Sequence, residues 1–87
     1  MEMKRMKYRC PCCGFSTFDG KPKSGYAICP VCFWEDDPSA YEEPDEAFGC
    51  NGVSLAQARE NFQKFGACRE EMRKYTRVPK AEEMSSR

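Results

Sequence analysis

Two short cysteine motifs constrain this chain more than any other feature of its sequence. CPCCG at residues 10–14 and CPVC at residues 29–32 each hold cysteines three positions apart, and fifteen residues separate the two pairs. Two residues between cysteines allow a tight turn to aim both sulfurs at one point, and a hairpin between the pairs can complete the tetrahedron that zinc prefers. The spacing predicts one metal ion per chain, with zinc as first choice, held by Cys10, Cys13, Cys29 and Cys32.

The predicted ligand set also limits the chemistry. Four cysteines close the coordination sphere, whereas catalytic zinc keeps one position open for water or substrate. We therefore expect a structural site, whose binding energy is on the order of 10–16 kcal/mol in zinc-finger peptides. The chain has no histidine, no nucleophile–base spacing and no glycine-rich phosphate loop. We expect no enzymatic activity and infer no small-molecule substrate.

Three of the seven cysteines lie outside this set. Cys12 is an alternative to Cys10 or Cys13 as a ligand, but adjacent or i, i+2 sulfurs converge less well on one ion, so we predict a free thiol. That thiol is either a redox sensor beside the metal or a solvent-facing residue of the turn, and we favour the second interpretation. Cys68 is expected to be a small buried hydrophobe. Cys50, in a turn-rich stretch, is left open between exposed and buried.

The length of 87 residues predicts a single domain over residues 1–79. Residues 8–34 read as a zinc ribbon, in which Thr17 and Phe18 precede the hairpin signal Asp19-Gly20 and residues 25–28 form a returning strand. Residues 35–52 are predicted to be an irregular acidic connection. Residues 80–87 are expected to form a flexible tail.

Residues 54–77 are predicted to be helical. Ser54 and Gln57 form a capping box, and Gly66 suits a left-handed end to the first helix. One apolar stripe marks that helix and another marks a second short helix, which ends before Val78-Pro79; the stripes are Leu55, Ala58, Phe62 and Phe65, then Cys68, Met72 and Tyr75. The predicted fold class is a small metal-stabilised α+β domain, a zinc ribbon (a short β-hairpin with two CxxC knuckles) followed by one or two C-terminal helices.

Charge is unevenly distributed although the formal net charge is zero. Residues 1–9 carry four basic residues and one acidic residue, and residues 35–46 carry seven acidic residues and no basic one. A globally basic footprint, typical of nucleic-acid binding, is missing. No stretch approaches the roughly 20 apolar residues of a membrane span. Seven cysteines without an export signal indicate a reducing compartment, so we expect a cytoplasmic location.

Several residues are candidates for contact with a partner. Trp34 is predicted to lie in the core, with an exposed stacking platform for a base as the alternative. The acidic residues 35–37 are predicted to be a solvated loop, with contact to a basic partner as the alternative. Arg73 and Lys74 belong to a basic cluster that glutamates interrupt, so a solvated face is favoured over a contact surface.

The motifs CPCCG, CPVCFWEDD and SLAQARENFQKFGAC, within residues 8–77, resemble the bacterial cysteine-rich CPCC family. The resemblance implies a bacterial cytoplasmic protein with a zinc ribbon and a helical C-terminal part. Only the four predicted ligands are carried across, because the resemblance implies no activity and no catalytic residues.

Three functions compete on these observations. A zinc-stabilised protein-interaction module leads, because the predicted site is closed and the charge is uneven. A nucleic-acid-binding ribbon comes second, with the basic leader and Trp34 as contacts. A rubredoxin-like iron electron carrier comes third, because four sulfurs also accept iron, although Phe33 stands where rubredoxin-type turns place glycine.

Overall fold

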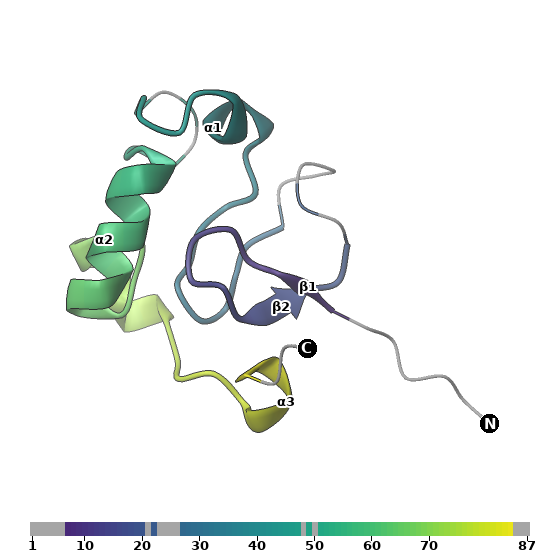
Figure 1. The fold of residues 1–87 in the computed structure, drawn as a ribbon. Coiled ribbons are helices and arrows are strands. Elements are labelled where there is room, and N and C mark those ends of the chain that lie inside the picture. The colour runs from purple at the N-terminus through teal and green to yellow at the C-terminus, as the bar shows by residue number, and fades with distance from the viewer. Residues whose placement is uncertain (1–6, 21, 23–26, 48, 50, 85–87) are drawn as a thin grey trace.

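The computed structural model describes residues 7–20, 22, 27–47, 49 and 51–84 (Figure 1). α2 lies on one side of the loop-rich cysteine region, with α1 beyond one end of that helix and α3 close to β2. The arrangement is a small α+β fold, as predicted. Its elements in chain order are β1 (Tyr8–Arg9), β2 (Ser16–Phe18), α1 (Pro38–Glu42), α2 (Leu55–Phe65), the 3₁₀ helix η1 (Glu70–Tyr75) and α3 (Ala81–Met84).

The two strands enclose the first cysteine motif. β1 pairs antiparallel with β2, with Tyr8 opposite Phe18 and an irregularity between Tyr8 and Arg9. The strands bracket residues 10–15, which we call the first knuckle. A single antiparallel bridge between Ile28 and Glu35 brackets residues 29–34, the second knuckle, in the same way.

The predicted hairpin between the two cysteine pairs is therefore wrong in its pairing. The partner of β2 is β1, and Asp19-Gly20 does not join two paired strands within the described residues. Each knuckle is itself a tight turn, so its own flanks meet with little loss of chain entropy, whereas a longer loop costs more to close. Residues 25 and 26 of the expected returning strand lie outside the described residues.

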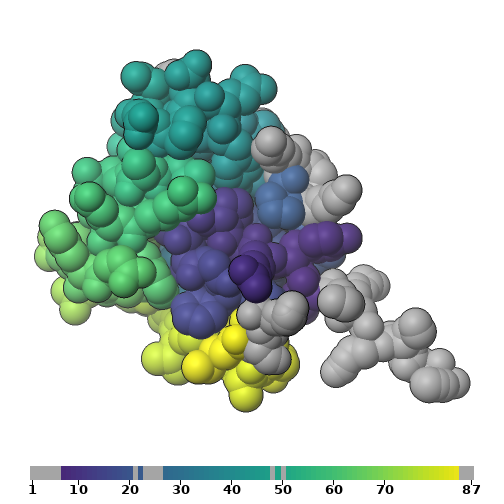
Figure 2. All heavy atoms as spheres, in the orientation of Figure 1, coloured from purple at the N-terminus to yellow at the C-terminus, as the bar shows by residue number. Residues whose placement is uncertain are grey.

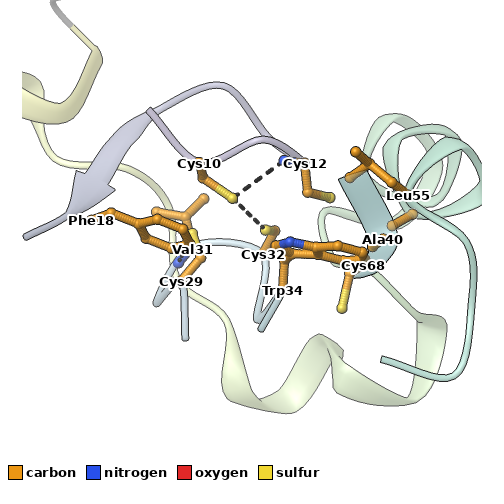
Figure 3. Close-up of a cluster of buried hydrophobic side chains, with 11 residues drawn as sticks. Cys10, Cys12, Phe18, Cys29, Val31, Cys32, Trp34, Ala40, Leu55 and Cys68 are labelled. Carbon is orange, nitrogen blue, oxygen red and sulfur yellow. Dashed lines mark hydrogen bonds between the residues drawn. The ribbon is translucent and has the colours of Figure 1, made fainter. Parts of the chain in front are cut away.

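Trp34 lies at the centre of the core. Its side chain has no exposed surface and belongs to one buried cluster with residues of both knuckles and of α1 and α2. In Figure 3 the indole extends from the second knuckle toward Ala40 and Leu55. Its Nε1 donates to the Tyr41 hydroxyl at 3.1 Å. The core position predicted for Trp34 is confirmed, and the alternative of an exposed stacking platform is wrong.

The predicted acidic connection is more ordered than expected, because it contains α1. Asp37 begins this helix as its N-cap, and its Oδ1 accepts hydrogen bonds from the Ser39 N–H at 3.1 Å and the Ser39 hydroxyl at 2.8 Å. Pro38 occupies the first helical position, where its missing N–H costs nothing. Asp36, only 1% exposed, accepts from the Tyr41 hydroxyl at 2.6 Å. The expectation of a solvated loop is wrong for both aspartates.

The signals predicted for α2 are largely confirmed. The Ser54 hydroxyl accepts from the Gln57 N–H at 3.0 Å, and Gly66 ends the helix with a φ of 78°. The Gln57 side chain donates to Asn61 Oδ1 instead of completing the capping box. The second helix differs from the prediction: it starts at Glu70 as a 3₁₀ helix and leaves Cys68 outside. Among the described residues, none of the helices combines the length and apolar character needed to cross a bilayer.

α3 lies in the segment predicted to be a tail. Arg77 forms two parallel hydrogen bonds with the buried Glu83 carboxylate, each 2.9 Å long. The Lys80 N–H also donates to that carboxylate at 2.8 Å. These bonds fix α3 to the segment that precedes it, and α3 lies against β2. Residues 85–87 of the predicted tail lie outside the described residues.

We predict that Glu83→Gln loosens α3. The Arg77 guanidinium lowers the pKa of Glu83 to about 2 from its ordinary 4.5, so the stabilisation is present above about pH 4.5 and is lost as the pH falls toward 2. Acid also protonates thiolates, so the substitution tests the pair more cleanly than pH does. Amide hydrogen exchange at residues 81–84 should become roughly several-fold faster. Glu82→Gln, at an exposed neighbour, is the matched control, and equal exchange in both variants would contradict the assignment.

Candidate metal centre

The four cysteines predicted to be ligands lie together. Their sulfur atoms all lie within 4.8 Å of one another. The Sγ atoms of Cys10 and Cys32 are 3.6 Å apart, and those of Cys13 and Cys29 are 3.8 Å apart. Each knuckle therefore contributes two sulfurs to one cluster, and both of these contacts join one knuckle to the other. This cluster is able to hold a metal ion.

The two knuckles repeat the same hydrogen bonds. The Cys10 N–H donates to the Phe15 carbonyl at 2.9 Å, and the Gly14 N–H donates to the Cys10 carbonyl at 2.8 Å. In the second knuckle the Cys29 N–H donates to the Trp34 carbonyl at 2.9 Å, and the Phe33 N–H to the Cys29 carbonyl at 2.8 Å. This shared turn directs both sulfurs of each knuckle to the same side.

Backbone N–H groups also point at the sulfurs. The Cys12 N–H donates to Cys10 Sγ, and the Val31 N–H donates to Cys29 Sγ, both at 3.4 Å. Such bonds stabilise a thiolate and orient it, which is the role of groups that surround a metal's ligands. The buried Thr17 hydroxyl lies 3.1 Å from Cys29 Sγ and adds a side-chain donor from β2. Cys29 is thus the most strongly hydrogen-bonded of the four.

The same turn requires a left-handed residue at its fifth position. Gly14 fills it in the first knuckle with a φ of 83°, and Phe33 fills it in the second with a φ of 68°. A residue with a Cβ is disfavoured there by roughly 1–2 kcal/mol. The Phe33 ring stacks on Tyr75 of η1, with centroids 5.0 Å apart and an interplanar angle of 26°. This contact offsets part of the backbone cost and attaches η1 to the second knuckle.

The sulfurs differ in their acid–base properties. The pKa of Cys29 is lowered because the thiols of Cys10, Cys13 and Cys32 and the Thr17 hydroxyl donate to its thiolate. The pKa values of Cys10 and Cys32 are raised, chiefly because other sulfurs of the group crowd them, with burial adding to the effect. Four sulfurs this close, three of them buried, cannot all ionise alone, whereas a bound cation favours the thiolate at each of them.

Two further cysteines among the described residues, Cys12 and Cys68, do not join the cluster. Cys12 is only 7% exposed and packs in the core, so the favoured prediction of a solvent-facing residue is wrong. Figure 3 shows its side chain pointing into the core, away from Cys10. Cys68 is a buried hydrophobe as predicted, and burial raises its pKa to about 12. Both thiols are free. Cys50 lies outside the described residues.

Three contacts that the sequence did not reveal attach the rest of the chain to the knuckles. The Cys68 N–H donates to the Cys32 carbonyl at 2.8 Å. Arg59 Nε, on α2, donates to the Pro11 carbonyl at 2.9 Å. The buried Asn51 side chain bonds both peptide groups of Glu35, accepting from its N–H at 2.8 Å and donating to its carbonyl at 2.9 Å. No local motif marks these residues, because each partner is distant in sequence.

The predicted contact residues Trp34, Arg73 and Lys74 do not form one exposed surface. Trp34 is buried and presents no surface to a partner. Arg73 and Lys74 lie exposed on η1. The Lys74 ammonium lies 5.4 Å from the centroid of the Tyr75 ring.

Comparison with known protein families gives one match: the sequence model of the family described as "Cysteine-rich CPCC" matches residues 8–83. The matched range includes both knuckles, α1, α2 and η1, and all of α3 except Met84. A comparison with curated proteins found no match.

We predict that Thr17→Val weakens metal binding about tenfold, because it removes the hydroxyl that donates to Cys29 and leaves a side chain of similar size. Competition with a chromophoric chelator for added Zn²⁺ measures the change. Thr17→Ser keeps the hydroxyl and should stay within about twofold of the wild type. Undiminished affinity in the valine variant would show that this bond does not support the ligand.

A second prediction concerns the strained turn. Phe33→Ala and Phe33→Gly both lose the stack on Tyr75, but only glycine also relieves the left-handed conformation. The glycine variant should therefore be more stable than the alanine variant by about 0.5–1 kcal/mol, after its larger loss of chain entropy. Chemical unfolding of the two metal-loaded variants measures the difference. An alanine variant as stable as the glycine variant would argue against strain at this position.

Proposed function

The chain belongs to the cysteine-rich CPCC family, and we propose that its four-cysteine cluster holds one structural Zn²⁺ ion. The sulfur separations carry this proposal. Zn–S bonds of about 2.3 Å in a tetrahedron place the sulfurs about 3.8 Å apart. Two pairs are separated by 3.6 and 3.8 Å, and no pair exceeds 4.8 Å. A small contraction of the longer separations suffices to complete the coordination sphere.

Zinc would act here as a cross-link between the knuckles. With four cysteine ligands the ion has no open position for water or substrate, so we propose no catalytic role for it. Each knuckle supplies two of the four sulfurs, so the ion would hold together segments that are otherwise separate turns. The described cysteines are all free thiols, which suits a reducing compartment, and we propose a cytoplasmic location on that ground.

We further propose that the zinc-stabilised fold is a protein-interaction module. The exposed acidic residues after α1 support this proposal, since none of them forms an ion pair among the described residues. A charge-complementary protein surface would satisfy them. These residues are Glu43, Asp45 and Glu46. The alternative of a nucleic-acid-binding ribbon loses its aromatic contact, because Trp34 is buried.

Iron is the other metal to be tested. The sequence argument against iron was the phenylalanine at the position that glycine occupies in rubredoxin-type turns, but Phe33 adopts the left-handed conformation of Gly14. That argument therefore no longer separates the metals, and four thiolates accept either. Metal analysis of protein purified without added metal decides: a colourless protein with about one zinc per chain supports the proposal, and a red protein with a reversible one-electron couple contradicts it.

We predict that substitution separates ligands from bystanders. Cys10→Ser and Cys29→Ser should abolish tight binding of the metal and unfold the knuckles, because each leaves an incomplete coordination sphere. Cys12→Ser and Cys68→Ser, which alter buried thiols outside the cluster, should keep one metal per chain at a cost of roughly 1–2 kcal/mol in stability. Metal content and circular dichroism on the same samples measure both effects. A Cys12→Ser protein that loses its metal would overturn the ligand assignment.

A further inference from the structure

A groove lies where the first knuckle meets α1 and α2. Its volume is about 320 Å³. Segments distant in the sequence line it, and on the face shown in Figure 2 the first knuckle (purple), the α1 region (teal) and α2 (green) come together. The lining residues are Pro11, Pro22, Tyr41, Pro44, Leu55 and Arg59.

The groove is mainly apolar and has stiff walls. Three of its lining residues are prolines, which fix φ and have no backbone N–H to offer a ligand. Leu55 adds an aliphatic side chain and Tyr41 an aromatic one, each held by the core or its hydrogen bonds. Such a surface gains affinity by burying an apolar side chain, and its rigidity lowers the entropy lost on binding.

Arg59 supplies a fixed positive charge at this groove. Its Nε donates to the Pro11 carbonyl at 2.9 Å, which orients the guanidinium. Arg59 forms no ion pair with any described residue. The terminal N–H groups of a guanidinium favour two parallel bonds to a carboxylate, so an acidic group is the partner they fit.

The acidic residues after α1 supply the opposite charge. Pro44 lines the groove, and Glu43 and Asp45 flank it in the chain. The Pro44 carbonyl accepts from the Ala56 N–H at 3.0 Å, which attaches this acidic segment to the start of α2. A ligand in the groove therefore meets a guanidinium from α2, and the acidic segment after α1 runs along the edge of the groove through Pro44.

We infer that the groove binds an extended protein segment that carries an apolar side chain between one acidic and one basic group. This inference rests on the proposed interaction module and names its surface and its partner chemistry. The apolar side chain fills the groove, the carboxylate pairs with Arg59, and the basic group faces Glu43 and Asp45. Because Pro11 lies between Cys10 and Cys12, the groove forms only when the first knuckle is folded.

The test uses zinc-loaded full-length protein, isotope-labelled for NMR, and capped synthetic peptides of lysine, leucine and glutamate separated by alanine spacers of varied length. The lysine–leucine–glutamate peptides should bind with a Kd on the order of 0.1–1 mM, as suits a small groove, and should shift the amide signals of Tyr41, Leu55 and Arg59. Peptides with two lysines or two glutamates, and those with glycine in place of leucine, should bind about tenfold more weakly.

Variants then assign the contacts. Arg59→Gln should weaken binding about tenfold or more, whereas Lys64→Gln, an equal change of charge at the other end of α2, should not. Pro44→Ala keeps the carbonyl that accepts from the Ala56 N–H but removes part of the groove wall, so it should weaken peptide binding about threefold. This variant replaces Arg59→Gln in the test if the Arg59→Gln protein does not fold.

Zinc content, measured on every sample, separates the two proposals. A protein that holds one zinc per chain but shows no groove shifts at millimolar peptide overturns the inferred groove and leaves the metal proposal intact. Three other results would also overturn the inferred groove. They are amide shifts confined to Arg73 and Lys74, displacement of the peptide by an RNA oligonucleotide, and self-association of the protein through the groove. A protein without metal would refute the proposed zinc centre itself.

Discussion

Four sulfurs converge on one point, and the two turns that carry them receive hydrogen bonds from distant parts of the chain. α2 reaches the first knuckle through Arg59, and the segment after it reaches the second through the Cys68 N–H. Asn51 bonds the flank of the second knuckle. Among the residues that the structure describes, the sheet has two short strands, so ladder bonds alone cannot hold so small a domain. Contacts with the knuckles replace the extensive sheet that a larger protein would use.

The two knuckles share a backbone but differ in what surrounds them. The first has glycine at its left-handed position and leaves that residue exposed, whereas the second has Phe33, which receives η1 through Tyr75. Three of the clustered cysteines are almost fully buried, while Cys13 keeps partial exposure. The first knuckle therefore faces outward beside the proposed groove, and the second is enclosed by Trp34 and the helical part. This asymmetry places a binding surface on one side of a cluster that has no open coordination position.

The features that depend on a few neighbouring residues were predicted correctly from the sequence. The ligand set followed from two spacings of three residues, and the ends of α2 followed from Ser54 and Gly66, since such signals act within one turn of chain. Contacts between segments that are distant in the sequence were not predicted correctly. The strand partner of β2, the burial of Cys12 and the order in the acidic segment all depend on segments that meet only after folding. Hydropathy does not predict the burial of Asp36 and Asp37, because that burial depends on the hydrogen bonds that their carboxylates accept in the folded structure.

The sequence by itself determined the chemistry of the cluster and the position of its main helix, because cysteine spacing and helix caps are properties of a few neighbouring residues. Only the tertiary structure decided which surfaces are available to a partner. In the folded protein Trp34, a candidate residue for contact with a partner, is buried. Arg59 and Pro44 of the acidic segment both line an apolar groove. The physical reason is that exposure and pairing belong to the packed arrangement: a side chain meets solvent or a partner according to what the rest of the chain brings beside it.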